Sequence, residues 1–347
     1  MRTRCAGVSA AAGLAPRPAS QRRGPSSPYN PPMKIAAHVA LALLAVHAAS
    51  AQAKKIYKFT DDAGVVHFTD KPPATDRPVQ ESVVKVEPGA MVQLRIDGHD
   101  AQRQARVFNH FAGPAQVELS VGDVRNIATD PPLPLTVVMR AGEERVLASL
   151  QQADRGQPAG FELALRAIPG SPDAHHDDVE YGWPLAGYPV RIHQGFDGAF
   201  SHTGEESRYA IDVAAEEGTP VAAARDGVVM EVQDDYYGAG LDKEKFATRA
   251  NVVRVLHKDG SMAIYAHLKP ESVGVQAGKY IYAGQKLGES GNTGYSTGPH
   301  LHFCVQVNRG MRLVSVPFRM RGPDGTALQL DAAATDATAA KRTAAGE

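Results

Sequence analysis

Histidine and aspartate side chains gather in three short clusters in the C-terminal half of the chain. The first places His202 ahead of Asp212, the second surrounds His267, and the third contains His300 and His302. Residues i and i+2 of a strand point to the same side, so His300 and His302 are expected to share a face. Imidazole nitrogens and a carboxylate oxygen suit Zn²⁺, and a catalytic zinc keeps three protein ligands and one water. The clusters therefore indicate a zinc site.

Serine, histidine and aspartate together are also the parts of a nucleophilic triad. The serines near the third cluster, such as Ser296, lie in a glycine-rich turn between Gly291 and Gly298. A turn of this kind lets a peptide backbone approach closely. The zinc interpretation is favoured over the serine triad.

Residues 190–310 resemble the lysostaphin/LytM-type, or β-lytic, zinc metallopeptidases, which cut peptide bonds in bacterial cell-wall peptidoglycan. The resemblance covers about a third of the chain, and its last motif is long and specific. The matching segments are Tyr209-Ala-Ile-Asp212, Glu217-Gly-Thr-Pro-Val221, Ala223-Ala-Arg-Asp-Gly227, Tyr265-Ala-His-Leu268, Gly284-Gln-Lys-Leu-Gly288, Gly291-Asn-Thr-Gly294 and Ser296-Thr-Gly-Pro-His-Leu-His-Phe303.

The resemblance implies a role for each residue of the clusters. It makes Asp212 and His302 zinc ligands, and it makes His267 and His300 the catalytic pair that acts on the water and the tetrahedral intermediate. It also implies a β-sheet peptidase domain built from a duplicated hybrid motif. The expected function is a zinc metalloendopeptidase, a hydrolase whose partners are peptidoglycan peptides and whose cofactor is Zn²⁺.

One position departs from the family pattern. The third ligand of the family is a histidine four residues before the aspartate, where this chain has Arg208, and a guanidinium cannot ligate zinc. The nearest upstream histidine is His202, and Gly204–Ser207 is interpreted as an insertion that brings it into the ligand position. His193 is a weaker candidate. His202 is therefore predicted to be the third metal ligand.

A catalytically degenerate module that binds the wall or activates an amidase is the alternative function. Degenerate LytM-type domains usually lose several ligands or catalytic histidines, whereas Asp212, His267, His300 and His302 are all present here. Known activators also tend to carry long coiled coils, and residues 52–180 contain no sustained heptad pattern. An active enzyme is favoured.

Residues 33–51 are predicted to be a secretory signal peptide. Lys34 supplies the positive charge, a short apolar stretch follows, and Ala49-Ser50-Ala51 is a cleavage site. The apolar run is shorter than the ~20 residues of a transmembrane span. Met33 is interpreted as the true initiator, with residues 1–32 untranslated. The mature chain then starts near Gln52 in the periplasm, where other envelope proteins are candidate partners.

Charge and cysteine content exclude several classes of protein. The six Lys and Arg before Gln52 hide an acidic mature chain, in which 31 Lys and Arg face 38 Asp and Glu, a net charge of −7. Such a chain is a poor candidate for non-specific nucleic-acid binding. Two cysteines cannot build a disulfide framework or a CxxC zinc ribbon. After cleavage only Cys304 remains, and it is expected to be a buried, inert thiol.

The elements that must position the clusters are short strands, and the chain is predicted to be all-β. Residues 52–82 are expected to form an N-terminal hairpin module and linker, 83–170 a small β-sandwich, 171–180 a solvated linker, 181–318 the peptidase domain, and 319–347 a tail with a disordered end. The hairpin resembles a small module of unknown function found in Gram-negative envelope proteins. Strand-like runs in the peptidase domain are Val221–Ala224, Val228–Val232, Val252–Leu256, Met262–Ala266 and His300–Val307.

Two further features of the peptidase domain carry expectations. Gly218-Thr-Pro-Val-Ala-Ala223 matches Gly278-Lys-Tyr-Ile-Tyr-Ala283 at an offset of 60 residues, which indicates two copies of a strand pair packed together. Residues 234–250 form a long insertion. It is interpreted either as a substrate-facing wall or as a disordered surface loop.

Overall fold

The computed structural model describes residues 3–5, 54–60, 66–69, 73–75, 78–84, 89–99, 102–185 and 187–331. The predicted signal peptide, nearly all of the upstream segment 1–32 and the end of the tail, residues 332–347, lie outside the described residues. The chain divides into two compact units, one made of residues 9–86 and one made of residues 1–8 with 87–347. Each is described by itself.

The smaller unit contains an antiparallel three-stranded sheet. The predicted hairpin is present as β2 (Lys54–Thr60) and β3 (Val66–Thr69). A third strand, β4 (Gln80–Val84), pairs with the other edge of β2. The expectation that residues 74–82 are only a linker is therefore wrong at its end. An isolated two-stranded hairpin is marginal in water, and a third strand supplies the pairing it lacks.

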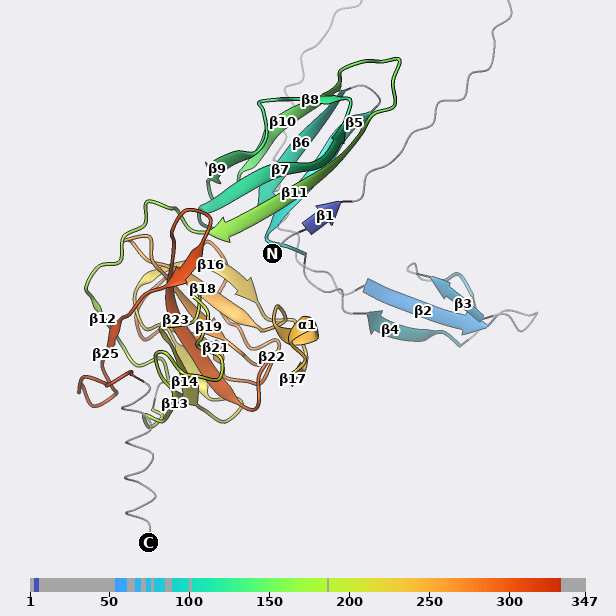
Figure 1. The fold of residues 1–347 in the computed structure, drawn as a ribbon. Coiled ribbons are helices and arrows are strands. Elements are labelled where there is room, and N and C mark those ends of the chain that lie inside the picture. The colour runs from blue at the N-terminus through green and yellow to red at the C-terminus, as the bar shows by residue number, and fades with distance from the viewer. Residues whose placement is uncertain are drawn as a thin grey trace, which may run out of the picture. The chain divides into compact units, whose positions relative to one another are not determined.

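Two four-stranded sheets form the predicted β-sandwich (Figure 1). One has the order β1-β11-β7-β9 and the other the order β5-β6-β10-β8. The strands are β1 (Thr3–Cys5), β5 (Val92–His99), β6 (Gln102–Asn109), β7 (Ala115–Arg125), β8 (Ile127–Asp130), β9 (Leu135–Met139), β10 (Glu144–Gln152) and β11 (Gly160–Pro169).

Alternating burial explains why these segments are strands. Along β7 the inward residues Ala115, Val117 and Leu119 are fully buried, while the residues between them are half-buried. This period of two fills the space between the sheets with apolar side chains. β6 alternates in the same way over Ala105–Asn109, whereas β10 breaks the alternation at Leu147 and Ala148, which are both buried.

An eight-stranded sheet forms the centre of the C-terminal domain, with the order β13-β14-β23-β19-β18-β16-β20 and β24 added beside β23. β18 and β19 have the bounds predicted from the sequence. The strands are β13 (Ile192–Gln194), β14 (Ala210–Ala214), β16 (Gly227–Gln233), β18 (Val252–Leu256), β19 (Met262–Ala266), β20 (Tyr280–Ile281), β23 (His300–Asn308) and β24 (Leu313–Ser315).

The repeat at an offset of 60 residues corresponds to an exchange of strands. β15 (Pro220–Ala222), in the first copy, pairs with β21 (Lys286–Glu289), which follows the second copy. In return β20, in the second copy, pairs with β16, which follows the first. Gly218 and Gly278 begin the two copies with φ angles of 89° and 84°, a left-handed conformation that favours glycine. The strand of each copy thus pairs with the strand that follows the other copy.

Residues 171–180 are not a solvated linker. Ala174 is buried, the amide of His175 donates to the carbonyl of Asp259, and the amide of Asp177 donates to the Asp259 carboxylate. The expectation fails because this segment covers the turn between β18 and β19.

The beginning of the expected tail also belongs to the C-terminal domain. β25 (Arg319–Met320) pairs in parallel with β12 (Glu180–Tyr181), and Leu330 is part of the domain's hydrophobic core. Of the expected tail, only residues 332–347 lie outside the described residues. The packed domain therefore extends past residue 318.

The insertion at residues 234–250 is ordered, so the disordered-loop interpretation is wrong. It contains β17 (Ala239–Gly240) and the one-turn helix α1 (Lys243–Phe246), whose N-cap Asp242 accepts the amide of Lys245. β17 pairs in parallel with β22 (Gly294–Tyr295). This pairing fixes the insertion beside the glycine-rich turn that precedes the third histidine cluster.

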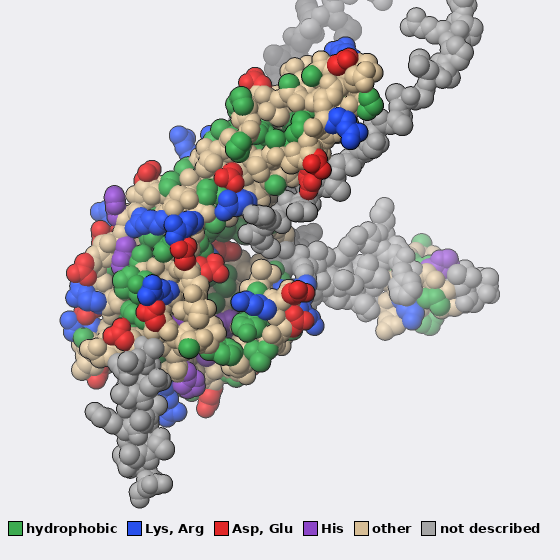
Figure 2. Space-filling view, in the orientation of Figure 1, with side chains coloured by type: hydrophobic (Ala, Val, Ile, Leu, Met, Phe, Trp, Pro, Cys, Tyr) green, Lys and Arg blue, Asp and Glu red, His purple; other side chains and the backbone are tan. Residues whose placement is uncertain are grey.

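The described residues include no helix long and apolar enough to span a membrane. On the face drawn in Figure 2, Lys and Arg side chains are interspersed with Asp and Glu side chains rather than gathered in one basic area.

Candidate metal centre

Asp212 and His302 lie opposite each other on neighbouring strands. In the antiparallel pairing of β14 with β23, Asp212 is the partner of His302, and on the other side His302 is the partner of Ala266 at the end of β19. His267 is the next residue along the chain. Strand register thus brings together Asp212, His267 and His302, although Asp212 and His302 are 90 residues apart in the sequence.

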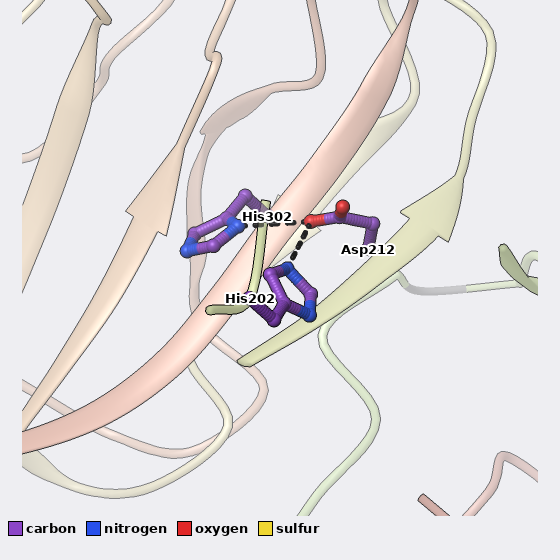
Figure 3. A group of neighbouring side chains, drawn as sticks. All are labelled: His202, Asp212 and His302. Carbon is purple, nitrogen blue, oxygen red and sulfur yellow. Dashed lines mark hydrogen bonds and ion pairs between the residues drawn. The ribbon is translucent and has the colours of Figure 1, made fainter. Parts of the chain in front are cut away.

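Three side chains form a group whose ligand atoms all lie within 4.8 Å of one another: His202, Asp212 and His302 (Figure 3). Oδ1 of Asp212 is 2.8 Å from Nδ1 of His302 and 3.3 Å from Nε2 of His202. The same three residues are the ligands predicted from the sequence. Within the described chain no other group of three or more His, Cys, Asp and Glu side chains meets this spacing.

His202 reaches the centre from a turn. Its amide donates to the carbonyl of Gly198, and its Nδ1 is 2.8 Å from the carbonyl oxygen of Gly195. A carbonyl oxygen can only accept, so the imidazole carries its hydrogen on Nδ1. Nε2 then presents a lone pair toward Asp212.

The segment that follows β13 is held by the residues around Leu330. The amide of Phe196 donates to the carbonyl of Leu330 at 2.7 Å, and a side chain in place of the Gly195 hydrogen would collide with that carbonyl. Gly195 is therefore required for a close backbone contact. Through this contact the residues around Leu330 help to orient His202.

The pairing of His202 with Asp212 is the strongest indication of a cation. Nε2 of His202 is buried and has no hydrogen-bond partner, although the carboxylate oxygen is only 3.3 Å away. Two electron-rich atoms facing each other away from water repel, unless a cation or a proton lies between them. The arrangement suits a metal ion that both atoms ligate.

The distances fit zinc. Two ligand atoms at about 2.0–2.1 Å from a tetrahedral zinc are roughly 3.3 Å apart, the separation between His202 Nε2 and Asp212 Oδ1. The contact of Asp212 with His302, at 2.8 Å, is a hydrogen-bond distance. Two imidazoles and one carboxylate leave a fourth position for water or substrate.

Asp212 is held in its charged form. Burial alone would raise its pKa, but the hydrogen bond between Oδ1 and the imidazole of His302 holds the pKa of the carboxyl well below its usual value. A carboxylate that stays ionised is the form that binds a metal.

Arg208, at the family's third-ligand position, and the weaker candidate His193 both lie outside the metal-ligand group. Arg208 is exposed and pairs with the carboxylate of Asp197, with its guanidinium over the ring of Tyr209. His193 is exposed and is not in the metal-ligand group.

His267 and His300 lie beside the group, with ring centroids 4.5 Å apart. Nδ1 of His267 is 2.6 Å from the carbonyl of Thr293, and Nδ1 of His300 is 2.8 Å from the carbonyl of Gly298. Like His202, both rings carry their hydrogen on the tethered nitrogen and keep Nε2 free. Nε2 of His300 is 3.7 Å from Oδ1 of Asp212.

Both imidazoles are kept neutral. Burial, reinforced by the neighbouring histidines, lowers the pKa of His267 to about 3. Burial also lowers the pKa of His300, against the opposing influence of Asp212. A neutral imidazole with a free Nε2 can accept a proton from water.

Asn251 is a functional candidate that sequence reasoning missed. Its side chain is fully buried, and Nδ2 donates to the carbonyl of Leu268. Its backbone carbonyl accepts the amide of Leu268. Its amide donates to the hydroxyl of Thr293, whose carbonyl holds His267. His267 itself has a φ of 62°, a strained value for a histidine. Asn251 fixes both sides of that strained residue.

The serine alternative gains no support from the site. Gly294–Gly298 does spell G-x-S-x-G, and Ser296 Oγ is 3.3 Å from Nδ1 of His300. However, that nitrogen carries a hydrogen toward Gly298, and the Ser296 hydroxyl donates to the same carbonyl at 2.9 Å. Neither atom is free to activate the other. The turn also leads into strand β23 rather than into a helix.

Cys304 is buried, as expected, and burial raises the pKa of its thiol. A thiol of this kind is inert.

Fold and site together define the class of protein: an all-β protein whose central sheet carries a candidate metal centre of two histidines and one aspartate. Residues 206–313 match peptidase family M23, and residues 40–92 match a domain of unknown function, DUF4124. The chain therefore carries an M23 peptidase domain behind a DUF4124 module, which confirms both resemblances. His202 lies just ahead of the matched M23 residues.

Curated relatives include lysostaphin of Staphylococcus simulans, 34% identical over 147 residues that make up 42% of this chain and 25% of that protein. A second is the DD-carboxypeptidase/endopeptidase Mpg of Neisseria gonorrhoeae, 38% identical over 108 residues, 31% of this chain and 20% of that protein. The chain spans about a quarter or less of the length of these relatives. Among solved structures, the lysostaphin catalytic domain of S. simulans is 32% identical, covering 39% of this chain and 88% of that one, with a TM-score of 0.24.

Proposed function

We propose that this protein is a zinc metalloendopeptidase that hydrolyses peptide bonds in peptidoglycan. The observation that carries the proposal is the buried Nε2 of His202, which faces Oδ1 of Asp212 at 3.3 Å without a hydrogen bond. His302 completes the set of three ligands. Relatives named as an endopeptidase and as a DD-carboxypeptidase/endopeptidase support the substrate class.

His202, Asp212 and His302 would hold the ion. When bound, zinc supplies Lewis acidity, which polarises a carbonyl and lowers the pKa of a water toward ~7. The free Nε2 of either His267 or His300 can accept the proton of the attacking water. The imidazole that takes the proton becomes a hydrogen-bond donor, and it can then stabilise the developing oxyanion or pass the proton to the leaving amine.

The alternative, a wall-binding or amidase-activating module, has no need for the second pair of histidines. Those histidines are nevertheless tethered to backbone carbonyls and directed at the ligand group. Holding His267 in the left-handed region costs free energy that binding alone does not require. The enzyme is therefore the preferred function.

Product analysis tests the proposal. The purified mature chain is incubated with purified peptidoglycan sacculi, its zinc content is measured, and released muropeptides are separated by mass. We expect close to one zinc per chain and new peptide ends, both lost after treatment with a chelator. Zinc-loaded protein that binds sacculi without releasing new peptide ends would support the non-catalytic module instead.

We also propose that the protein acts in the periplasm. The support is the sequence pattern of residues 33–51, with Lys34, the apolar stretch and the Ala49-Ser50-Ala51 site. Intact-mass measurement of the native protein should place its first residue near Gln52. Peptides from residues 1–32 in the cell's proteome would contradict translation from Met33.

A further inference from the structure

One amide side chain joins the candidate carboxylate ligand to the turn that delivers His202. Gln194, the last residue of β13, donates from Nε2 to Oδ2 of Asp212 at 2.9 Å and to the hydroxyl of Ser201 at 2.6 Å. Its Oε1 accepts the amides of Phe200 and Ser201. Ser201 directly precedes His202. The amide therefore links the two ligands that face each other in the centre.

The two oxygens of Asp212 have separate partners. Oδ1 faces the imidazoles, at 2.8 Å from His302 and 3.3 Å from His202, whereas Oδ2 accepts the Gln194 amide. A hydrogen bond to one oxygen fixes the rotation of the carboxylate and so the direction of the other oxygen. The carboxylate is thereby presented to a metal through one oxygen.

The backbone around Gln194 is shaped to hold its side chain. A side chain at Gly198 would overlap the Cγ and Cδ atoms of Gln194, so the turn packs directly against the amide arm. The carbonyl of Gly198 accepts the amide of His202, and the carbonyl of Gly195 accepts its imidazole. Residues 195–202 thus fold around Gln194, and the position of His202 depends on it.

We propose that Gln194 is a positioning residue of the metal centre, which raises zinc affinity by orienting Asp212 and by anchoring the turn that carries His202. This inference rests on the proposed zinc centre. It explains how the chain manages without a histidine at position 208: an inserted turn is longer and freer than a strand position, and Gln194 removes that freedom before the metal binds. Groups that orient metal ligands typically contribute 10–100-fold in affinity.

Zinc affinity tests this directly. Gln194→Met in the full mature chain keeps the length of the arm but has no amide, and Gln194→Ala removes both. The dissociation constant is measured by competition with a chromophoric zinc chelator, and the melting temperature of the chelator-treated protein is recorded beside it. We expect both variants to bind zinc about 10–100-fold more weakly than the parent protein.

Gln116→Met is the matched control. Gln116 is also half-buried, and its amide oxygen accepts hydrogen bonds from Asn308 and from the amide of Met311, away from the metal centre. It should lower the melting temperature without changing zinc affinity. An unchanged affinity in Gln194→Met, or an equal loss of affinity in Gln116→Met, would overturn the inference.

The outcomes separate this inference from the proposed function. If the parent protein binds zinc but releases nothing from sacculi, the proposed hydrolysis fails, and the affinities of the Gln194 variants still decide the role of Gln194. If the parent protein binds no zinc, the zinc centre and the role of Gln194 fail together.

Discussion

Nε2 of His202 lies 3.3 Å from Oδ1 of Asp212, and this nitrogen is buried and has no hydrogen-bond partner. It carries no hydrogen because Nδ1, on the opposite side of the ring, donates to the carbonyl of Gly195. His267 and His300 are tethered in the same way, to Thr293 and Gly298. Three backbone carbonyls thus direct three lone pairs into one space, an arrangement suited to a cation and to proton transfer beside it.

Removal of a candidate ligand should remove the metal. Asp212→Ala, His202→Ala and His302→Ala each leave two protein ligands, so we expect loss of bound zinc after dialysis and loss of hydrolysis. Arg208→Ala is the control, because Arg208 is exposed and pairs with Asp197 instead. Metal analysis by mass spectrometry measures the result. Retention of zinc by His202→Ala, or its loss from Arg208→Ala, would contradict the ligand assignment.

Removal of a proton-transfer histidine should leave the metal in place. His300→Ala is expected to keep zinc and to lose about 10²–10⁴-fold in turnover, the usual contribution of a positioned acid or base. His267→Ala should behave in the same way, because its nearest tether is the backbone of Thr293 rather than a ligand. If His300→Ala loses zinc as completely as His302→Ala, the separation of roles is wrong.

Strand parity explains why the core of the site could be predicted. His300 and His302 share a face of β23, and the specific motifs around Asp212 and His267 identify their neighbouring segments. The position of His202 depends on an insertion of variable length. Only its residue type and its nearness in sequence pointed to it.

Gln194, Asn251 and Thr293 could not be found from the sequence. They act through backbone carbonyls and through side-chain contacts between distant segments, and such contacts leave no periodicity or motif. The third strand β4 and the packed segment 171–180 were missed for a related reason. Both are polar or short, and their partners are distant in the sequence.

Asn251→Ala should slow hydrolysis without removing zinc. The side chain of Asn251 donates to the carbonyl of Leu268, the residue after the strained His267, and it both donates to and accepts from the backbone of Tyr236. Its loss leaves buried groups unpaired, at about 1–3 kcal/mol each, and frees His267 to move. A displacement of about 1 Å costs on the order of 10²-fold in rate. Turnover and zinc content are measured well below the melting temperature.

Asn109→Ala is the matched control for Asn251. Asn109 is also a buried asparagine, and its side chain also bonds to backbone atoms, of Gly113, Arg140 and Phe111, but it lies in the β-sandwich. It should cost comparable stability and leave turnover unchanged. Equal slowing by both variants would show that Asn251 acts only through stability.

Acid should destabilise the folded chain through His257. Burial lowers the pKa of His257 to about 4, its Nδ1 is 2.7 Å from the carbonyl of Asp226, and its buried Nε2 has no partner. Arg225, Asp259, His176 and Tyr181 surround the ring. Between an unfolded-state pKa of about 6.5 and the folded value, the unfolded chain binds more protons. Stability from this group is therefore complete above about pH 6.5 and is lost as pH falls toward 4.

His257→Asn tests the pH dependence, because it removes the titrating ring and keeps a donor for Asp226. Urea unfolding is compared at several pH values in chelator-treated protein. The release of a bound metal then makes no contribution to the pH dependence of the free energy of unfolding. The parent protein should lose roughly 3 kcal/mol more than the variant between pH 7 and pH 4. Identical slopes in the two proteins would exclude His257 as the source.

The β-sandwich and the peptidase domain should unfold together, because they share a core. Met230 of β16 and Met262 of β19 belong to the same buried cluster as Leu119 and Val117 of the sandwich. The amide of Ala112 donates to the carbonyl of Met230, and the space beside these methionines is so tight that side chains at Gly113 or Gly170 would overlap them. Separate domains would leave this apolar surface in water.

Trp183, the single tryptophan of the chain, packs against the core of the peptidase domain and reports on that domain alone. Leu119→Ala, in the sandwich, should cost about 2–5 kcal/mol, the usual range for a buried leucine. If the two domains form one cooperative unit, the midpoint of the Trp183 fluorescence transition moves to a lower urea concentration. The free energy of unfolding obtained from that transition then falls by the same amount. Val138→Ala, at an exposed position of β9, should leave the transition where it is. An unchanged Trp183 midpoint in Leu119→Ala, with a separate earlier transition in circular dichroism, would mean that the domains unfold independently.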